Sequence, residues 1–435
     1  MVSCLTADNY LVTPYVTQDN GASPEGNNPP GKISSKTSLG PGLQIIRERY
    51  RGWLFDEAFP FWDRFGVDHE NGGLFCGLDY DGNRVTDEKF MWYQGRGLWV
   101  YSHAYRRHGR NSRFLETARR TYEFLLRSGR DDSGLWWSSV GPGGEPIEGA
   151  DLMGFAGMFA AEGMQEFARA TGETDVLENA LEAYRRTRST FEDRSRSAKP
   201  HYLPLHYPGI RLLGHEMVFI RFLTQVLRQH EDPDLREALR QAVANALGPF
   251  FHPIHGLTSE ALDANLNRPD DVNDDFFVLG HGMETMWMIM EAAVLLDDDE
   301  VLETAFARFR THSEASWDTK NGGFRTALSL SRGALPGRLL WHHDEALIGN
   351  LMLYAMTGSD QALDQFLRID EFTTDTFRVE GRSGPVWALE ANDSNTPPAQ
   401  VDRMGNYHLP RRLMLCLELF DAIERSNTAQ GNISI

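Results

Sequence analysis

Cysteine is scarce in this chain of 435 residues, which has only Cys4, Cys76 and Cys416. An odd and small number of cysteines does not suit a framework of disulfide bonds. No Cys-x-x-Cys pair is present either, so the spacing typical of structural zinc sites is missing. The cysteine content therefore predicts a reducing compartment, and we expect the cytoplasm.

Long apolar runs are also absent. No window approaches the ~18 uninterrupted apolar residues that indicate a membrane-spanning helix. The N-terminal stretch MVSCLTADNYLVTPYV has no basic region followed by a long apolar segment, so we expect no secretory signal. These patterns predict a protein that does not associate with a membrane.

Positive charge is in the minority. The chain has 43 lysines and arginines against 62 aspartates and glutamates, which gives a formal net charge of −19. A field of this sign repels phosphate backbones, so we expect no nucleic-acid partner.

Several motifs of enzyme classes are missing as well. The sequence contains no HExxH, no GxxxxGK[ST] and no GxSxG. These absences argue against a zinc protease, a P-loop nucleotide-binding enzyme and an α/β-hydrolase.

The composition divides the chain into three parts. Residues 18–42 are rich in glycine, proline, serine and asparagine, which predicts a disordered leader over residues 1–42. A similar tail follows at residues 427–435. Residues 43–426 show one continuous helical pattern without a linker, so we expect a single domain there.

Two kinds of helix alternate along this domain. One kind is amphipathic, as in NSRFLETARRTYEFLL, where apolar residues recur at helical spacing. The other kind is apolar on nearly all sides, as in MGFAGMFAAEGMQEFA and GMETMWMIMEAAVLL, which indicates burial on every side. Glycine-containing turns such as ENGGLF and KNGGFRT separate them.

The buried helices repeat at a period of about sixty residues, which is strong evidence for a repeat architecture. Their starts read WYQGRGLW from Trp92, MGFAGMFA from Met153, GHEMVFIR from Gly214, GHGMETMW from Gly280, WHHDEALI from Trp341 and YHLPRRLM from Tyr407. We therefore predict an all-α fold, an (α/α)6 toroid of six helical hairpins with short β-hairpins at one end. An open solenoid is the alternative, but it needs polar terminal caps, and YHLPRRLMLCLELF has no such character.

Equivalent positions of the six buried helices carry polar residues. The second position holds Tyr93, Gly154, His215, His281, His342 and His408, and the position one turn later holds Arg96, Gly157, Val218, Glu284, Glu345 and Arg411. Burying such groups is costly unless they are paired. Their recurrence around a ring predicts a functional site on the axis.

Four kinds of site are compatible with this ring. Histidine and glutamate at i, i+3 can bind a metal in helical bundles, but Arg96 and Arg411 at equivalent positions oppose a dication. Glu284 and Glu345 can serve a glycoside hydrolase. The number of histidines favours proton transfer near neutral pH, and a non-catalytic sugar-binding barrel is the fourth reading.

Three blocks of the sequence resemble the N-acylglucosamine 2-epimerase superfamily. They are NGGLFCGLDYDGNRVTDEKFMWYQGRGLWVYSHAYRR, GHGMETMWMIMEAA and YHLPRRLMLCLELF. The superfamily includes cellobiose 2-epimerases and mannose-type aldose–ketose isomerases. Its QGR, GHxxE and H-x-P-R motifs occur here in order, and the resemblance covers residues 45–425.

The resemblance implies roles for individual residues. His281 and His408 fall on the acid–base pair, Arg96 on an essential arginine, and Glu284 and Glu345 on carboxylates that orient an imidazole. Trp341 and His343 fall on substrate contacts, and we group Tyr93, His215, His342 and Arg411 with them from the ring. His215 resembles the cellobiose and mannose branches more than the N-acylglucosamine branch.

The resemblance also implies a chemistry. A histidine removes the C2 proton of an open-chain aldose, and the resulting enediolate receives a proton at C2 or at C1, which gives epimerisation or aldose–ketose isomerisation. No metal and no redox cofactor is implied. The implied partner is a small-molecule sugar, and the implied assembly is a monomer or a homodimer.

Overall fold

The computed structural model describes residues 33–34, 37–193, 195, 200, 202–329, 331 and 333–431, with the backbone alone for residues 427–431. Most of the expected leader, residues 1–32 and 35–36, lies outside the described residues, as do residues 432–435. The described end of that segment contacts the barrel. The amide of Ser34 donates to the carbonyl of Ala355 over 2.8 Å, and Thr37 is buried.

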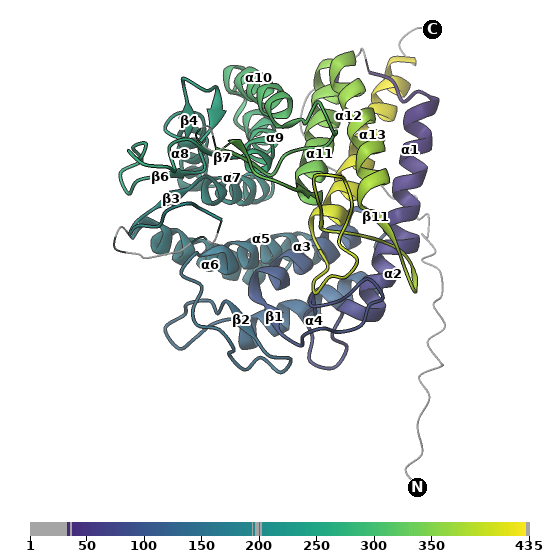
Figure 1. Ribbon diagram of the computed structural model, residues 1–435. Helices are drawn as coiled ribbons and strands as arrows, with labels where there is room; N and C mark the ends of the chain where they lie inside the picture. The colour runs from purple at the N-terminus through teal and green to yellow at the C-terminus, as the bar shows by residue number, and fades with distance from the viewer. Residues whose placement is uncertain are drawn as a thin grey trace.

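Six inner helices surround the axis of the molecule (Figure 1). They are α3 (Met91–Arg107), α5 (Phe155–Thr171), α7 (Leu213–Leu227), α9 (Leu279–Leu296), α11 (Leu340–Thr357) and α13 (His408–Gly431). Each begins within two residues of the start that the repeat predicts. All 15 residues of α7 are buried, as expected for a helix that is apolar on every side.

An outer layer of amphipathic helices covers the inner ring. It contains α4 (Ser112–Ser128), α6 (Thr174–Glu192), α8 (Pro233–Leu247), α10 (Asp299–Ser316) and α12 (Asp360–Phe377). The sixth outer position is filled from the N-terminus by α1 (Pro41–Gly52), η1 (Trp53–Ala58), α2 (Phe59–Phe61) and η2 (Trp62–Gly66), of which η1 and η2 are π-helical.

The ring is closed. Each inner helix contacts the next one along the chain, and α13 contacts α3. Figure 1 shows α1 beside α13, where Arg47 forms ion pairs with Asp421 and Glu424. The first and last parts of the domain therefore cover each other. This closure confirms the predicted (α/α)6 toroid and excludes the open solenoid, because neither terminal repeat leaves an apolar face uncovered.

Short antiparallel strand pairs lie at the end of the barrel where the inner helices begin, which we call the histidine end. The pairs are β1 (Lys89–Phe90) with β2 (Ser139–Val140), β3 (Arg211–Leu212) with β6 (Ala261–Leu262), β4 (Phe251–His252) with β5 (Leu257–Thr258), β10 (Arg338–Leu339) with β13 (Glu390–Ala391) and β11 (Arg378–Gly381) with β12 (Gly384–Trp387), and β8 (Ala327–Ser329) joins β7 (Phe276–Val278) and β9 (Gly333–Ala334). The expected short β-hairpins are thus confirmed.

No N-cap residue bonds the first turn of α3, α5, α7, α9 or α11 through its side chain. Four outer helices do have such caps, for example Asp232 at α8 and Ser359 at α12. The first amides of α3, α7 and α11 instead donate to backbone carbonyls, and Asp151 accepts from Ala156 in α5 over 2.6 Å. The dipoles of the inner helices make the histidine end locally positive. That end is therefore suited to a substrate on which negative charge develops.

Helix α13 reaches Gly431, further than the expected end of the domain at residue 426. A helix already anchored by a buried face is extended at low cost, because each added residue gains one hydrogen bond. Among the described helices, none combines the length and the hydropathy needed to cross a membrane.

Candidate active site

Two imidazoles lie on either side of Trp341 at the histidine end. His281 is in the first turn of α9, and His408 begins α13. Their side chains are 18% and 19% exposed, in contrast to the fully buried His342 between them in the sequence of repeats. Trp341 bridges them, with its ring centroid 5.1 Å from that of His281 and 5.5 Å from that of His408. Both predicted acid–base residues therefore share one partly exposed site.

Glu260 holds His281 in place. Nδ1 of His281 lies 2.9 Å from Oε2 of this fully buried glutamate, whose Oε1 accepts from the hydroxyl of Tyr202 over 3.1 Å. Burial lowers the pKa of His281. The charge of Glu260, its hydrogen bond and the charge of Glu284 outweigh burial, so the pKa is raised above its ordinary value.

Glu345 orients His408 in the same way as Glu260 orients His281. Nδ1 of His408 lies 2.8 Å from Oε1 of Glu345, which is fully buried. Burial, followed by the charges of Arg96 and Arg411, lowers the pKa of His408 well below its ordinary value. The two imidazoles are thus oriented alike through Nδ1, but their pKa values are shifted in opposite directions.

Arg96 provides a cation without a carboxylate partner among the described residues. Its guanidinium stacks over Phe159 at 4.0 Å, Trp92 at 4.6 Å and Tyr407 at 4.9 Å. Its Nε is buried without a hydrogen bond. Burial lowers its pKa, yet an arginine remains charged under such conditions. This positive charge is available to an anionic group at the site.

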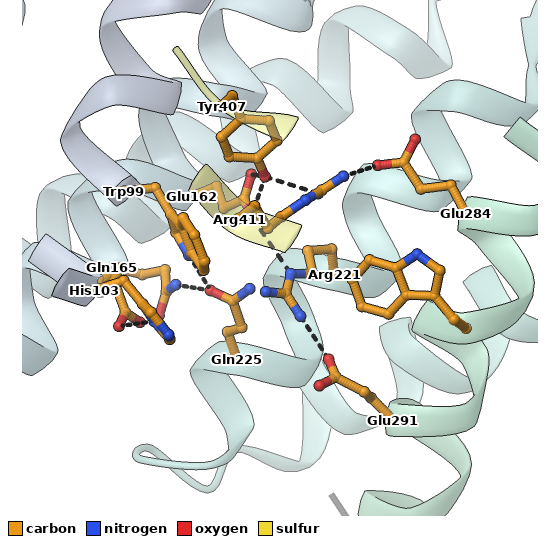
Figure 2. Close-up of polar contacts among 12 residues, drawn as sticks. Trp99, His103, Glu162, Gln165, Arg221, Gln225, Glu284, Glu291, Tyr407 and Arg411 are labelled. Atoms are coloured by element: carbon orange, nitrogen blue, oxygen red, sulfur yellow. Dashed lines mark hydrogen bonds and ion pairs between the residues drawn. The ribbon is translucent and has the colours of Figure 1, made fainter. Parts of the chain in front are cut away.

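Arg411 differs from Arg96 because its charge is already balanced. It is 1% exposed, and its Nη2 donates to Glu284 and to Glu345, while its Nη1 donates to the hydroxyl of Tyr407 over 3.0 Å. Figure 2 shows Arg411 with Tyr407 and Glu284 beneath the histidine end. The sequence predicts that Arg411 contacts the substrate. The structure instead places its guanidinium in a buried network of hydrogen bonds and ion pairs.

The same network bears on metal binding. The ligand atoms of Glu284, Glu345 and His408 lie within 4.8 Å of one another, a spacing that suits a metal ion. Nη2 of Arg411 contacts both carboxylates and lies 3.2 Å from Nδ1 of His408. A guanidinium therefore already supplies the cation at this point, and its charge disfavours a dication.

Glu284, which the resemblance implies to orient an imidazole, bonds neither His281 nor His408. The i, i+3 spacing places His281 and Glu284 on one helix face, but Glu284 lies one turn deeper and bonds Arg411. The orienting carboxylate is Glu260, from the segment before β6, which sequence reasoning missed. Its only signal is a glutamate in the short segment GLTSEAL after a predicted glycine turn.

Four residues predicted as substrate contacts are buried in the core. Tyr93 is 5% exposed, and His215, His342 and His343 are 0% exposed. His215 stacks between Phe155 and Phe191, with ring centroids at 4.6 and 4.5 Å. Their burial disfavours direct contact with a substrate. Trp341 is the member of the predicted contact set that stays partly exposed.

His343 has a structural partner in the first repeat. Its Nδ1 bonds the carbonyl of Leu339 over 2.8 Å, and its Nε2 accepts from the amide of Phe324 over 3.0 Å. Gln94 occupies the equivalent helix position and bonds the amide and carbonyl of Leu74 over 2.7 and 2.8 Å. Leu74 and Phe324 both follow an Asn-Gly-Gly turn. Each side chain thus fixes the turn of its own repeat.

This equivalence predicts that His343→Gln preserves the fold and the activity, whereas His343→Ala is destabilising. Alanine leaves the buried Phe324 amide unsatisfied, which costs about 1–3 kcal/mol. Urea unfolding measures the free energy of unfolding of both variants. Loss of activity by a stable His343→Gln variant would restore His343 to a role in substrate binding.

Comparison with known proteins places the chain in a family. The model of the N-acylglucosamine 2-epimerase (GlcNAc 2-epimerase) family matches residues 72–410. The chain is 26% identical to the N-acylglucosamine 2-epimerase of Bos taurus over 87% of this chain and 94% of that protein. It is 24% identical to the cellobiose 2-epimerase of Bacteroides fragilis over 86% of this chain and 99% of that protein.

A solved structure agrees with the fold. The cellobiose 2-epimerase of Spirochaeta thermophila DSM 6192 superposes with a TM-score of 0.76 at 21% identity, covering 89% of this chain and 99% of that one. The match of the family model over most of the barrel, together with full-length relatives of the same kind, leads to one conclusion: the chain belongs to the N-acylglucosamine 2-epimerase family and is an enzyme of the isomerase class.

Proposed function

We propose that the protein is a sugar 2-epimerase in which His408 is the base and His281 the acid. The observation that carries the proposal is that His281 and His408 lie on either side of Trp341 and that each is held through Nδ1 by a buried carboxylate. Their surroundings shift the two pKa values in opposite directions, up at His281 and down at His408. Two groups whose pKa values are pushed apart suit an acid and a base at one pH. Both imidazoles keep Nε2 for chemistry because Nδ1 is held by a carboxylate.

The first step is removal of the C2 proton from the open-chain sugar. Nδ1–H of neutral His408 donates a hydrogen bond to Glu345, so the lone pair of the base is on Nε2. The C2–H bond breaks, its proton moves to His408, and its electrons form the C1–C2 double bond of an enediolate. The negative charge that appears on O1 is stabilised by Arg96.

The second step returns a proton to C2 from the opposite face. Protonated His281 donates from Nε2, and the carbonyl at C1 forms again with inverted configuration at C2. His281 ends neutral and His408 ends protonated, and exchange with solvent restores both. Trp341, between the imidazoles, offers an apolar ring face against which the carbon chain of the sugar packs. A proton delivered to C1 instead yields a ketose.

The glycoside hydrolase alternative loses support from the position of its carboxylates. Glu284 and Glu345 are 3% and 0% exposed, and both bond one nitrogen of Arg411. A hydrolase needs one free carboxylate and one protonated acid facing the glycosidic bond.

Deuterium exchange tests the proposed function. The enzyme is incubated in D2O with N-acetylmannosamine, cellobiose or D-mannose, since relatives carry the names N-acylglucosamine and cellobiose 2-epimerase. We expect deuterium at C2 of the 2-epimer of one of these sugars, detected by NMR. Deuterium at C1 of a ketose would replace epimerisation with isomerisation. Binding of these sugars without exchange at either carbon would contradict the proposal.

The pKa shifts predict a bell-shaped dependence of kcat/KM on pH. Activity falls at acid pH as His408 gains a proton at its lowered pKa, and at alkaline pH as His281 loses one at its raised pKa. Glu260→Gln removes the charge that raises the pKa of His281, so the alkaline limb should move to lower pH while the acid limb stays. Glu231→Gln, at an exposed ion pair, is the control. Equal movement of both limbs would contradict the assignment.

A further inference from the structure

A second polar cavity lies at the far end of the barrel, where the inner helices end. Its volume is about 50 Å³, and it is lined by side chains from the later turns of α3, α5, α7, α9 and α11, from the middle of α13 and from Arg228 after α7. Figure 2 shows His103, Arg221, Gln225 and Glu291 in this region, on the side of Arg411 away from the histidine end. The proposed epimerisation uses none of these residues.

Positive charge exceeds negative charge around this cavity. The charged lining residues are Arg106, Arg107, Arg169, Arg221, Arg228, Glu166, Glu291 and Glu418. Two carboxylates are each shared between two arginines: Glu166 lies 2.8 Å from Arg106 and 3.2 Å from Arg169, and Glu291 lies 2.5 Å from Arg221 and 3.6 Å from Arg228. Five guanidinium groups and three carboxylates therefore line the cavity, and a fourth carboxylate, Glu162, pairs with Arg221 from outside the lining at 3.6 Å, so a surplus of one positive charge remains in a protein whose net charge is −19.

The surplus of positive charge around the cavity adds to the effect of burial on the pKa of Arg169. Burial, opposed by Glu166 but supported by the charges of Arg106, Arg228 and Arg107, lowers the pKa of Arg169 to about 10. Crowding of like charges in a partly buried site favours an added anion. Helix C-termini also attract cations, so part of the surplus balances the ends of the inner helices.

One buried donor at the cavity lacks an acceptor. Nε2 of Gln225 has no hydrogen-bond partner among the described residues, although this side chain is 2% exposed. Nε of nearby Arg221 makes no hydrogen bond either, but it forms an ion pair with Oε1 of Glu162 at 3.6 Å. The oxygen of Gln225 is already used, because it accepts from Nε1 of Trp99 over 3.1 Å and from Gln165. An unsatisfied buried donor is costly. It indicates an acceptor that occupies the cavity.

The size of the cavity limits what this acceptor can be. One water needs roughly 10–15 Å³ on this measure, so about 50 Å³ holds a group of a few heavy atoms. That is too small for a sugar ring. The side chains of Arg106, Arg107 and Arg228 are 14–20% exposed, so solvent reaches the rim.

A metal ion is the less favoured occupant. The ligand atoms of His103, His108 and Glu418 lie within 4.8 Å of one another. Arg107, however, donates to Glu418 over 3.1 Å, and Nη2 of Arg106 lies 3.4 Å from Nδ1 of His103. These cations oppose a dication.

We propose that the far-end cavity is a binding site for a small tetrahedral oxyanion, either inorganic phosphate or the phosphate group of a small ester. Arginines bind such anions through paired N–H donors, and Gln225 supplies a further neutral donor. The site is separate from the imidazole pair and does not depend on the proposed epimerisation.

Isothermal titration of the full chain with inorganic phosphate tests the proposal. We expect saturable binding, with chloride at the same ionic strength giving no saturable signal. Glycerol phosphate serves as the ester: binding at least as tight as that of inorganic phosphate identifies an ester as the occupant, and no binding restricts the site to the free ion. Arg228→Gln should weaken phosphate binding about tenfold, because one charge-assisted contact is lost.

A second variant, expected to change phosphate affinity in the opposite direction, and a control variant outside the cavity complete the experiment. Glu418→Gln, at a side chain that is 14% exposed, removes a negative charge from the lining and should tighten phosphate binding. Arg236→Gln, at a similarly exposed arginine outside the cavity, should leave binding unchanged. Absence of saturable phosphate binding, or equal binding by the Arg228→Gln and Glu418→Gln variants, would overturn the proposal and leave water in the cavity.

Discussion

Replacement of His408 by asparagine is expected to reduce C2 proton exchange by ~10²–10⁴-fold, the usual contribution of a positioned general base. Asparagine has no basic nitrogen, so the C2 proton has no acceptor at this position. The fold should persist, because the 19% exposed side chain makes its main contact with Glu345, which Arg411 also holds. Deuterium incorporation at C2, followed by NMR in D2O, measures the effect.

The control for this substitution is His230→Asn, at an exposed histidine that follows α7. It should exchange at the wild-type rate. Circular dichroism and thermal unfolding establish that both variants are folded. Exchange by a folded His408→Asn variant within a few-fold of the wild-type rate would remove His408 from the mechanism and leave His281 as the remaining imidazole at the site.

Substitution of Arg96 by methionine should lower kcat by ~10²–10³-fold, as observed when a donor to a developing oxyanion is removed. Methionine keeps much of the apolar contact with Phe159, Trp92 and Tyr407 but carries no charge. The interaction strengthens as charge develops on O1, so kcat should fall much more than KM rises. Steady-state kinetics with the best sugar from the exchange assay separates the two constants.

Arg130→Met provides the matched control. Arg130 also stacks over an aromatic ring, with its guanidinium 5.2 Å from the centroid of Trp136, but it pairs with Glu182. We expect wild-type kcat and KM for this variant. A normal kcat for Arg96→Met, or an effect on KM alone, would show that Arg96 binds the ground state and that the enediolate is stabilised by another group, such as the inner helix ends.

The two ends of the barrel are joined by one buried polar network. Glu284 bonds Arg411, Arg411 and Glu162 both bond the hydroxyl of Tyr407, and Glu162 lies 3.6 Å from Arg221 at the far-end cavity (Figure 2). Such a network requires nearly every member to be paired, since an unpaired buried charge is strongly destabilising. This requirement explains why the charge of Arg411, which the repeat aligns with Arg96, is paired with Glu284 and Glu345 and not with a substrate.

The sequence alone determined the architecture and predicted which polar groups gather at one end of the barrel. The period of the buried helices indicated six hairpins in a ring, because an apolar helix of this kind must be covered on all sides. The alignment of their starts brought His281, His408 and Arg96 to one end of the barrel, and this prediction followed from connectivity and helix geometry alone.

The tertiary structure decided which of the equivalent residues face the site. His281 and His408 are partly exposed, whereas His215 and His342, at the equivalent repeat position, are fully buried, as is His343. The partner of His281 came from a different segment, where Glu260 lies near the strand pair β3–β6. Hydrogen-bond partners, burial and the resulting pKa shifts depend on contacts between distant segments. A repeat shows which helix end a residue occupies, whereas its neighbours across the ring decide whether it is a base, an acid or part of the core.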